Sequence, residues 1–452
     1  MKILRIKDNT SVSNEECGKL PHLTSELANK TLAQLAEEGV FVFPEVIDEA
    51  EDIEGKQFVL ESDGTNLRAG NVMGFLGCDD ERLVITSRFA SGENDFFLQY
   101  LLSKVLELPS VVDLRTDANQ DNLLLNFLMF LFPHYLKLAM RKGPYKKYTR
   151  REYNDSNVKG AFNIPRHIKL NTPFVGKIAY SQREFSCDNE LMELVRHTIE
   201  FIKRKQFGSK LLYRAKNEVE LVIGLTPSFK SCDAQKIINS NKKNMVRHAF
   251  YKEYGALQRL CLMILQQQKH QIGTGSRQIY GILFDGAWLW EEYINLLIGD
   301  TFFHPRNKAR KTADKHPQQL FTSTTEQGVI DKKQGLIYPD FISKNAENRL
   351  IADAKYKPVN NIGDRDYLQM LAYMYRFESK CGYFIYPEAN GEAAKVLRLN
   401  RGSTFENNVG ARDDVLVTKL GLRIPHDAES YQEFAEAMRE SEEELVRRMG
   451  GE

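Results

Sequence analysis

The sequence has 452 residues. At roughly 150 residues per domain this length indicates about three domains and excludes a single small binding module. Hydrophobic residues make up 42% of the chain and charged residues 27%, which is the composition of a globular protein and not of a disordered or membrane protein. Lysine and arginine (62) nearly balance aspartate and glutamate (61), so the net charge by itself does not indicate a nucleic-acid partner.

The compartment can be inferred from the cysteines and from the N-terminus. The six cysteines show no CxxC pair and no short repeating interval, which favours reduced thiols over a zinc site or a disulfide framework. The N-terminal residues MKILRIK lack the apolar core of a signal peptide. The most apolar run, residues 123–132, is about half as long as the ~20 residues that a membrane-spanning helix needs. These features predict a cytoplasmic protein.

The first two regions of the chain differ in their apolar spacing. Residues 1–115 contain short strand-like segments, with helical stretches near 24–38 and 94–106, and are predicted to form a β-rich domain. Residues 116–275 show mainly helical spacing. The helices expected there are 120–141, 188–206 and 242–270, with strand-like pieces near 145–182.

The last region, residues 276–452, has the order αβββαβ. Its expected elements are a helix at 284–298, a long polar loop, strands near 328–332, 336–343 and 349–356, a helix at 364–379 and a strand at 382–387. A further amphipathic helix is expected at 428–449. The predicted fold is therefore α/β, α+β overall, with a β-rich N-terminal domain, a largely helical middle and a C-terminal αβββαβ core.

Two stretches of the middle region are basic. Residues 137–151 and 203–216 contain no acidic residue, and tyrosines lie among the basic residues of the first stretch. Basic segments with aromatic side chains suit phosphate contacts and base stacking, so the pair indicates a DNA-contacting region, although a solvated surface explains either stretch alone. The candidate DNA-contacting residues are Lys146, Lys147, Arg150 and Arg151, together with Arg310 and Lys311 of the polar loop.

The segment YPDFISKNAENRLIADAKYK carries the most informative pattern. If residues 350–356 form a strand, its period of two places Asp353 and Lys355 on one face. Asp340 follows Pro339 on the preceding strand-like segment, and a turn between the two segments brings Asp340 toward Asp353. Two carboxylates suit one or two Mg²⁺ ions, and a lysine adds the positive charge that phosphodiester hydrolysis requires. The residue types match the PD-(D/E)xK nuclease pattern, although a simple ion pair at a strand edge also gives D-x-K.

Residues on two predicted helices extend this pattern. The helix in FDGAWLWEEYINLLI offers Glu291 and Glu292 as a further acid, and both lie at the borders of its apolar face, so periodicity does not choose between them. On the later helix, Gln369 and Tyr373 are spaced i and i+4 and lie on one face, as in the QxxxY signature of several such nucleases. They are predicted to support the site, although a helix that simply packs in the core explains them equally well. No histidine has metal-ligand spacing beside these carboxylates, so none is assigned a catalytic role.

Together these segments resemble the McrC family, the nuclease subunit of McrBC-type, modification-dependent restriction systems, and the larger LlaJI-like members in particular. The resemblance spans roughly residues 70–378. It is carried by MGFLGCDDERLVITSRF, VKGAFNIPRHIKLNTPFVGKIAYSQREFSCDNELMELVRHTIEFIK, FDGAWLWEEYINLLI, PDFI, IADAKYK and DYLQMLAYMYRF, in that order.

The resemblance implies a Mg²⁺-dependent DNA endonuclease of phage defence, acting on modified DNA and activated by a separate AAA+ GTPase ring. In the family the N-terminal domain docks on that ring. The family's L-[FW]-E motif maps onto Leu289-Trp290-Glu291 and favours Glu291 over Glu292. Asp340, Asp353 and Lys355 map onto the nuclease motif, with Asp353 one methylene shorter than the Glu of many relatives.

The chain itself lacks a nucleotide-binding motif. Its one Gly-rich candidate, residues 273–276, does not have the GxxxxGK[ST] framework, so any NTP dependence is expected to come from a partner. The alternative function is a non-catalytic adaptor that stimulates the NTPase of the partner and scaffolds it on DNA. A third interpretation, a stand-alone exonuclease or junction resolvase, shares the nuclease core but not the N-terminal domain.

Overall fold

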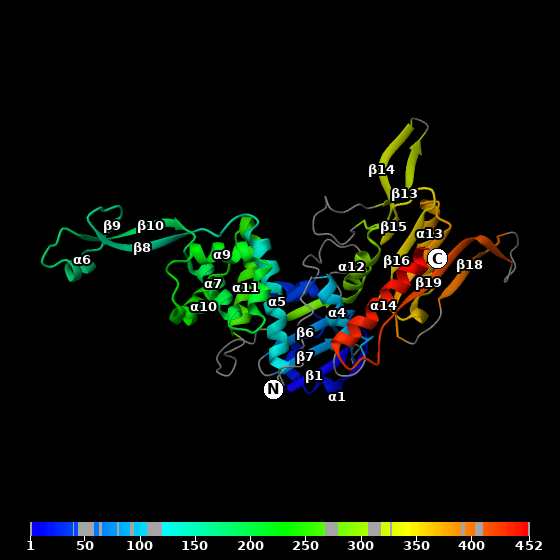
Figure 1. The fold of residues 1–452 in the computed structure, drawn as a ribbon, viewed down its shortest axis with the longest axis horizontal. Helices are drawn as coiled ribbons and strands as arrows, with labels where there is room; N and C mark the ends of the chain where they lie inside the picture. Colours follow the sequence, from blue (N-terminus) through cyan, green and yellow to red (C-terminus); the bar gives the residue numbers. More distant parts are fainter. Residues whose placement is uncertain are drawn as a thin grey trace. The chain divides into compact units, whose positions relative to one another are not determined.

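The computed structural model divides into two compact units, coloured along the chain in Figure 1. Unit 1 consists of Met1–Ser110 and Ser276–Glu452, and unit 2 of Val111–Gly275. The structure describes residues 2–38, 40–43, 58–62, 66–78, 81–90, 95–105, 120–266, 279–305, 318–325, 328–389, 394–402 and 410–450. The protein is a mixed α/β protein with several sheets.

A five-stranded mixed sheet joins the first and third predicted regions within unit 1. Its strand order is β1-β7-β6-β11-β3. β11 follows residue 276 in the chain, yet it pairs antiparallel with β6 and parallel with β3. Its side chains Ile282, Leu283 and Phe284 are fully buried, as expected of a central strand covered on both faces, and its backbone hydrogen bonds are satisfied by β6 on one edge and β3 on the other. The strands are β1 (Lys2–Lys7), β3 (Phe41–Phe43), β6 (Val72–Cys78), β7 (Glu81–Thr86) and β11 (Tyr280–Asp285).

Short helices and a small antiparallel sheet complete this part of unit 1. The helical stretch expected near 24–38 is two helices, because Asn29 between them adopts a left-handed φ of 58°. Leucines of both helices are buried in one apolar cluster with the five-stranded sheet. The elements are α1 (Asn14–Cys17), α2 (Pro21–Leu27), α3 (Leu32–Glu38), α4 (Phe96–Val105), β2 (Ser11–Ser13), β4 (Leu60–Ser62) and β5 (Asn66–Ala69).

The C-terminal part of unit 1 is built on a six-stranded sheet of order β12-β15-β16-β17-β19-β18. β16, β17 and β19 pair in parallel and the other neighbours are antiparallel. α13 packs on this sheet through Met370 and Tyr373, which share a core with Ile351 and Phe384. The elements are α12 (Gly286–Ile298), β12 (Phe302–Phe303), β15 (Phe341–Ser343), β16 (Leu350–Ala354), η4 (Val359–Asn361), α13 (Asp364–Arg376), β17 (Cys381–Glu388), β18 (Lys395–Asn400), β19 (Ala411–Arg423) and α14 (Tyr431–Gly450).

The strands between α12 and β16 differ from the expected ones. The first expected strand lies in a separate two-stranded hairpin of β13 (Gln318–Thr325) and β14 (Gly328–Ile337), outside the six-stranded sheet. The second expected strand, 336–343, is divided, because Pro339 lacks the N–H that a continuing strand requires. β18 and β19 were not predicted from the sequence, and β19 pairs in parallel with β17 in the sheet.

Unit 2 combines a helical bundle with a β-ribbon that carries a short helix (Figure 1). The helix expected at 242–270 is interrupted near residues 244–248. The Gln258 side chain pairs with backbone groups at this interruption: it accepts a hydrogen bond from Val246 N and donates one to Asn244 O. The helices are α5 (Gln120–Met140), α7 (Glu190–Lys203), α8 (Gly208–Tyr213), α9 (Lys216–Leu225), η1 (Ser231–Asp233), α10 (Ala234–Lys243), η2 (Ala249–Tyr251) and α11 (Lys252–Gln266). The ribbon comprises β8 (Lys147–Asp155), β9 (Ala161–Phe162), α6 (Ile164–Leu170) and β10 (Ile178–Ser186).

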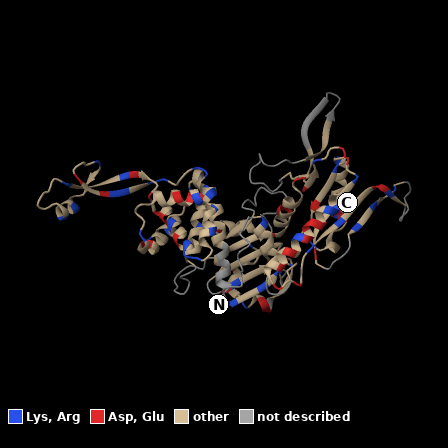
Figure 2. Cartoon of the chain, in the orientation of Figure 1, with Lys and Arg blue, Asp and Glu red and all other residues tan. Residues whose placement is uncertain are grey.

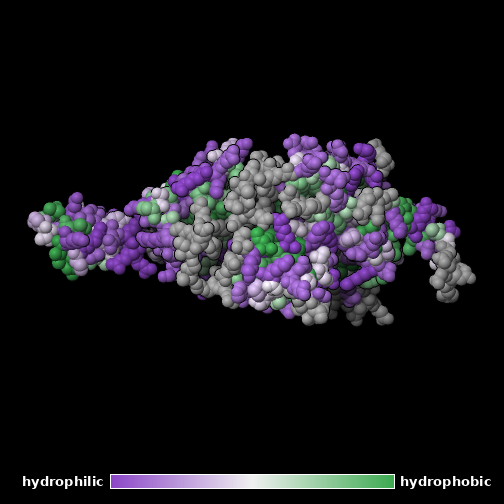
Figure 3. All heavy atoms as spheres, turned by 90° about the horizontal axis from the view of Figure 1, so that it is seen from below, coloured by the Kyte–Doolittle hydropathy of each residue, from purple (hydrophilic) through white to green (hydrophobic). Residues whose placement is uncertain are grey.

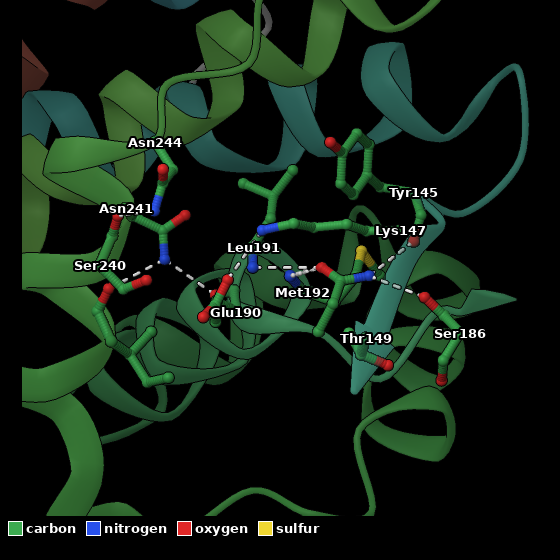
Figure 4. A network of polar contacts seen from close by, with 12 residues as sticks. Tyr145, Lys147, Thr149, Ser186, Glu190, Leu191, Met192, Ser240, Asn241 and Asn244 are labelled. Carbon is green, nitrogen blue, oxygen red and sulfur yellow. Dashed lines mark hydrogen bonds and ion pairs between the residues drawn. The ribbon is translucent and has the colours of Figure 1, made fainter. Parts of the chain in front are cut away.

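A polar network fixes the base of this ribbon to the bundle (Figure 4). Lys147 of β8 forms a 3.0 Å ion pair with Glu190 of α7. Asn189 caps α7 by accepting from Leu191 N and Met192 N, and its amide donates to the Tyr145 carbonyl at 3.1 Å. Asn241 of α10 donates to the backbone carbonyl of Glu190 at 2.9 Å.

The six cysteines are all free thiols, and none of the helices in the described ranges has the length and apolar character that crossing a bilayer requires.

In unit 1 a buried carboxylate fastens α14 to two other helices. Tyr100 of α4 and Tyr293 of α12 each donate to Glu442 Oε1 at 2.7 Å. Burial, reinforced by the Glu442 carboxylate, raises the pKa of both tyrosines, so both remain neutral donors. The same α12 carries Glu291, so this network bears on the candidate site.

We expect Glu442→Ala to lower the free energy of unfolding by about 3 kcal/mol, because it leaves two buried hydroxyls without an acceptor. The control is Glu444→Ala, which removes an exposed ion pair with Arg448 and should cost less than ~0.5 kcal/mol. Denaturant unfolding followed by tryptophan fluorescence measures both variants. The two tryptophans of the chain, Trp288 and Trp290, lie in α12 and therefore report on unit 1. Equal midpoints for the two variants would contradict this role of Glu442.

Candidate active site

The end of β16 brings together three of the predicted residues. Asp353 is 3% exposed, and Lys355 Nζ lies 2.6 Å from its Oδ2. Asp340, just before β15, accepts a hydrogen bond from the Ala354 N–H through Oδ2 at 2.8 Å. Tyr356 leaves the opposite face, as the strand period requires, and its ring packs on Gly286, where any Cβ would lie 2.6 Å from the ring. Two carboxylates and one ammonium therefore converge.

Lys355 is a cation in this environment. Burial of its side chain lowers its pKa, but the carboxylates of Asp353, Asp340 and Asp366 outweigh the burial, and the pKa of Lys355 lies above its ordinary value. Asp366 Oδ1 is 3.6 Å from Lys355 Nζ. A lysine that stays protonated can orient a water molecule or neutralise developing negative charge, but it cannot accept a proton.

α13 places Gln369 and Tyr373 beside Lys355. Gln369 Oε1 lies 3.5 Å from Lys355 Nζ, and Gln369 Nε2 donates to the Tyr373 hydroxyl at 2.6 Å. Burial, aided by the charges of Asp353 and Asp340, raises the pKa of Tyr373, so its hydroxyl stays protonated. Asp366 was not predicted as a site residue. Its position three residues before Gln369 places both on one face of the helix, and this spacing could have identified it.

The helix acid is connected to this cluster through His304. Asp285 caps the N-terminus of α12, because its side chain accepts a hydrogen bond from Trp288 N at 2.7 Å. His304 Nε2 lies 3.7 Å from Glu291 Oε1 and 3.8 Å from Glu292 Oε1, and His304 Nδ1 is 2.9 Å from the Asp340 carbonyl. The Glu291 side chain is 4% exposed and that of Glu292 33% exposed, so Glu291 is the acid that points inward.

His304 was not singled out by the sequence because its partners are distant in the chain. Burial lowers the pKa of His304, but the carboxylates of Glu292 and Glu291 and the Asp340 carbonyl outweigh the burial and raise that pKa overall. Its place directly after β12, which pairs with β15, is what brings it next to Asp340.

The donor groups fit Mg²⁺ in the form that this ion usually takes. In the described part of the chain no three His, Cys, Asp or Glu residues gather in a metal-holding arrangement. Mg²⁺, however, is commonly held by one or two carboxylates together with phosphate oxygens and water. Asp353 Oδ2 is buried and, apart from its ion pair with Lys355, has no hydrogen-bond partner, which leaves lone pairs for a cation. Asp340 and Asp353 would hold it, and Glu291, which is connected to Asp340 through His304, is the predicted third ligand.

The predicted DNA-contacting residues of β8 lie in unit 2 and are largely paired. Lys147 binds Glu190 and Arg151 binds Asp188 at 2.6 Å, while Arg150 Nε donates to Ser181 Oγ at 3.0 Å. Lys146 is exposed. Figure 2 shows basic and acidic residues intermixed along the ribbon, which weakens its attraction for phosphate. Arg310 and Lys311 lie outside the described residues, as does the Gly-rich segment 273–276.

The far end of the ribbon exposes apolar side chains, which sequence reasoning did not single out. Figure 3 shows hydrophobic residues gathered at this end. Exposed apolar patches of this kind often mark contact sites for other molecules. The residues that are at least half exposed there are Phe162, Ile164, Ile168, Phe174 and Val175; we call them the ribbon-tip patch.

The family of the chain follows from comparison with known proteins. The family model described as "McrBC 5-methylcytosine restriction system component" matches residues 67–387, well over half of the chain. Among curated proteins, none matches the chain.

Two solved structures resemble the chain at low sequence identity. One is a refined half-complex from a tetradecameric assembly of Thermococcus gammatolerans McrB AAA+ hexamers with bound McrC, at 13% identity and a TM-score of 0.46, covering 97% of this chain and 99% of that chain. The other is the Thermococcus gammatolerans McrBC complex, at 14% identity and a TM-score of 0.30, covering 68% and 89%. The extent of the family match, and not these two resemblances, decides the assignment: the chain belongs to the McrBC 5-methylcytosine restriction system component family.

Proposed function

We propose that this chain is the Mg²⁺-dependent DNA endonuclease subunit of an McrBC-like restriction system of the cytoplasm, acting on modified DNA and activated by a separate AAA+ GTPase. The observation that carries the proposal is the convergence of Asp340, Asp353 and Lys355 at the end of β16 in a chain of this family. The separate GTPase accords with the absence of a P-loop motif from the sequence.

Each residue has a defined part in this chemistry. When bound, one or two Mg²⁺ ions would polarise the scissile phosphate and lower the pKa of a bound water. Asp340, Asp353 and Glu291 supply the hard oxygen ligands. Lys355, held as a cation by the neighbouring carboxylates, orients the attacking water or neutralises the negative charge that develops on the phosphoryl oxygens. Hydrolysis of the P–O3′ bond would leave 5′-phosphate and 3′-hydroxyl ends.

A non-catalytic adaptor is the alternative function, in which the chain stimulates the NTPase of its partner and scaffolds it on DNA. The buried carboxylates of Asp353 and Glu291, and the ion pair of Asp353 with Lys355, argue against it. Burying ionised groups costs free energy, and a scaffold gains nothing from keeping them.

Two surfaces are candidates for docking on the AAA+ ring. The family resemblance assigns docking to the N-terminal domain, where Ile3 of the edge strand β1 is exposed. The ribbon-tip patch is the second candidate, because its apolar side chains gain free energy only when another surface covers them.

The first test is cleavage of methylated plasmid by the full chain with its AAA+ partner, GTP and Mg²⁺. We expect Asp353→Ala and Lys355→Ala each to slow cutting by at least ~100-fold, because each removes a group that the transition state needs. Asp413→Ala, which changes an exposed carboxylate of β19, should cut at the parental rate. Cutting that survives both site variants would refute the nuclease mechanism.

Further outcomes of this experiment separate the alternatives. GTPase stimulation without any cutting by the parental complex would favour the adaptor. Cutting by the chain alone, without a partner, would favour a stand-alone nuclease.

The second test distinguishes the two helix acids. Glu291→Ala should reduce cutting nearly as much as Asp353→Ala, whereas Glu292→Ala should retain at least about half of the parental rate, since only Glu291 is buried toward the site. Titration of cutting with Mg²⁺ measures both. The reverse ranking would make Glu292 the helix acid.

The third test separates the docking surfaces. Ile168→Asp with Phe174→Asp places two charges on the ribbon-tip patch, and Ile3→Asp places one on β1. If the patch docks, we expect the first variant to lose stimulation of GTP hydrolysis and co-elution with the ring, while Ile3→Asp keeps both. Loss in Ile3→Asp alone would assign docking to the N-terminal domain.

A further inference from the structure

His304 lies where two of the site's chain segments meet. It follows β12 directly, its side chain is 4% exposed, and its ring packs on Phe341 with the ring centroids 5.1 Å apart. β12 pairs with β15 in the register Phe303 with Ile342, so the neighbouring residue His304 reaches the segment just before β15. That segment contains Asp340.

The two ring nitrogens of His304 contact two different elements. Nδ1–H donates to the Asp340 carbonyl at 2.9 Å, and this bond fixes the orientation of the ring. Nε2 then faces Glu291 Oε1 at 3.7 Å and Glu292 Oε1 at 3.8 Å. The His304 imidazole therefore lies between the backbone of Asp340 and the carboxylate of Glu291, which are both candidate metal ligands.

Packing alone does not account for this arrangement. An apolar side chain would cover Phe341 equally well, but it would donate no hydrogen bond to the Asp340 carbonyl and would place no polar atom beside the Glu291 carboxylate. The Asp340 carboxyl is held separately, by a hydrogen bond from the Ala354 N–H. Because Asp340 is fixed in this way, a contact from His304 to Glu291 also fixes Glu291 relative to Asp340. In metal sites, groups that orient a ligand commonly change metal affinity by 10–100-fold.

We propose that His304 is a positioning residue: it holds the Glu291 carboxylate in a fixed relation to Asp340 and thereby sets the affinity of the site for a divalent cation. The inference rests on the proposed function, because it presumes that Glu291 and Asp340 are metal ligands. His304 itself is not a ligand in this scheme and acts only through Glu291.

The test measures metal binding directly, on the full chain without DNA or partner. Mn²⁺ replaces Mg²⁺ because the electron paramagnetic resonance signal of free Mn²⁺ reports how much is bound. We expect His304→Ala to weaken Mn²⁺ binding by at least ~10-fold. In a Glu291→Ala background the same change should have less than about a twofold effect, because the group through which His304 acts is then missing.

Two further variants guard against loss of folding. His304→Asn keeps a donor for the Asp340 carbonyl and loses the Nε2 contact, so it should bind Mn²⁺ as weakly as His304→Ala while unfolding near the parental temperature. His197→Ala removes another buried imidazole, in α7 of unit 2, and should leave Mn²⁺ affinity unchanged. Unaltered Mn²⁺ affinity in both His304 variants, or an equal loss in the Glu291→Ala background, would overturn the inference.

The failure of this inference can be distinguished from failure of the proposed function. If Asp353→Ala abolishes Mn²⁺ binding while the His304 variants bind normally, only the role of His304 is wrong. If the parental chain binds no Mn²⁺, or Asp353→Ala binds it as the parent does, the metal site itself is wrong, and the role of His304 falls with it.

Discussion

The ion pair between Asp353 and Lys355 requires polar partners around it, and residues from several elements of unit 1 supply them. Both side chains leave the end of β16 on one face, and a buried pair at 2.6 Å is tolerable only when the remaining charges and polar atoms around it are also satisfied. Gln369 and Asp366 of α13 approach the ammonium. The Ala354 N–H between the pair binds Asp340. The strand end thus holds Asp353, Asp340 and the Lys355 ammonium in one arrangement, and α13 adds Asp366 and Gln369 beside it.

The opposite face of the same strand ties this cluster to the N-terminal sheet. The Tyr356 hydroxyl lies 2.7 Å from Ser87 Oγ and donates to Met73 Sδ, both residues of the first region. Its ring occupies the space above Gly286, the first residue of α12. α12 in turn continues directly from β11, a strand of the N-terminal sheet. Lys355 and Glu291 are therefore one and five residues in the chain from Tyr356 and Gly286, which pack against the N-terminal part or against each other.

The pattern in the sequence predicted those parts of the site that depend on local geometry. The period of a strand placed Asp353 and Lys355 together, and helical spacing paired Gln369 with Tyr373, because both relations involve residues only two or four positions apart. His304 and the pairing of β11 were not predictable in this way, since their partners lie far along the chain and are chosen by tertiary packing. The basic residues of β8 show the same limit: sequence reveals the charge of Arg151 but not its partner Asp188.

The charge balance of the site gives a physical reason for its expected dependence on a cation. Asp340, Asp353 and Asp366 surround Lys355, and Lys357 pairs with Asp366 at 2.7 Å, while Glu291 is connected to Asp340 through His304. Such a cluster is negative overall, and at short range in a partly buried site it repels a DNA phosphate strongly. Lys355 cannot reverse this sign, because its charge is already engaged by the carboxylates that raise its pKa. A divalent cation would both relieve the repulsion among the acids and turn the cluster into a binding site for phosphate. The acids that repel DNA in the absence of a cation would then be the same groups through which a bound cation attracts phosphate.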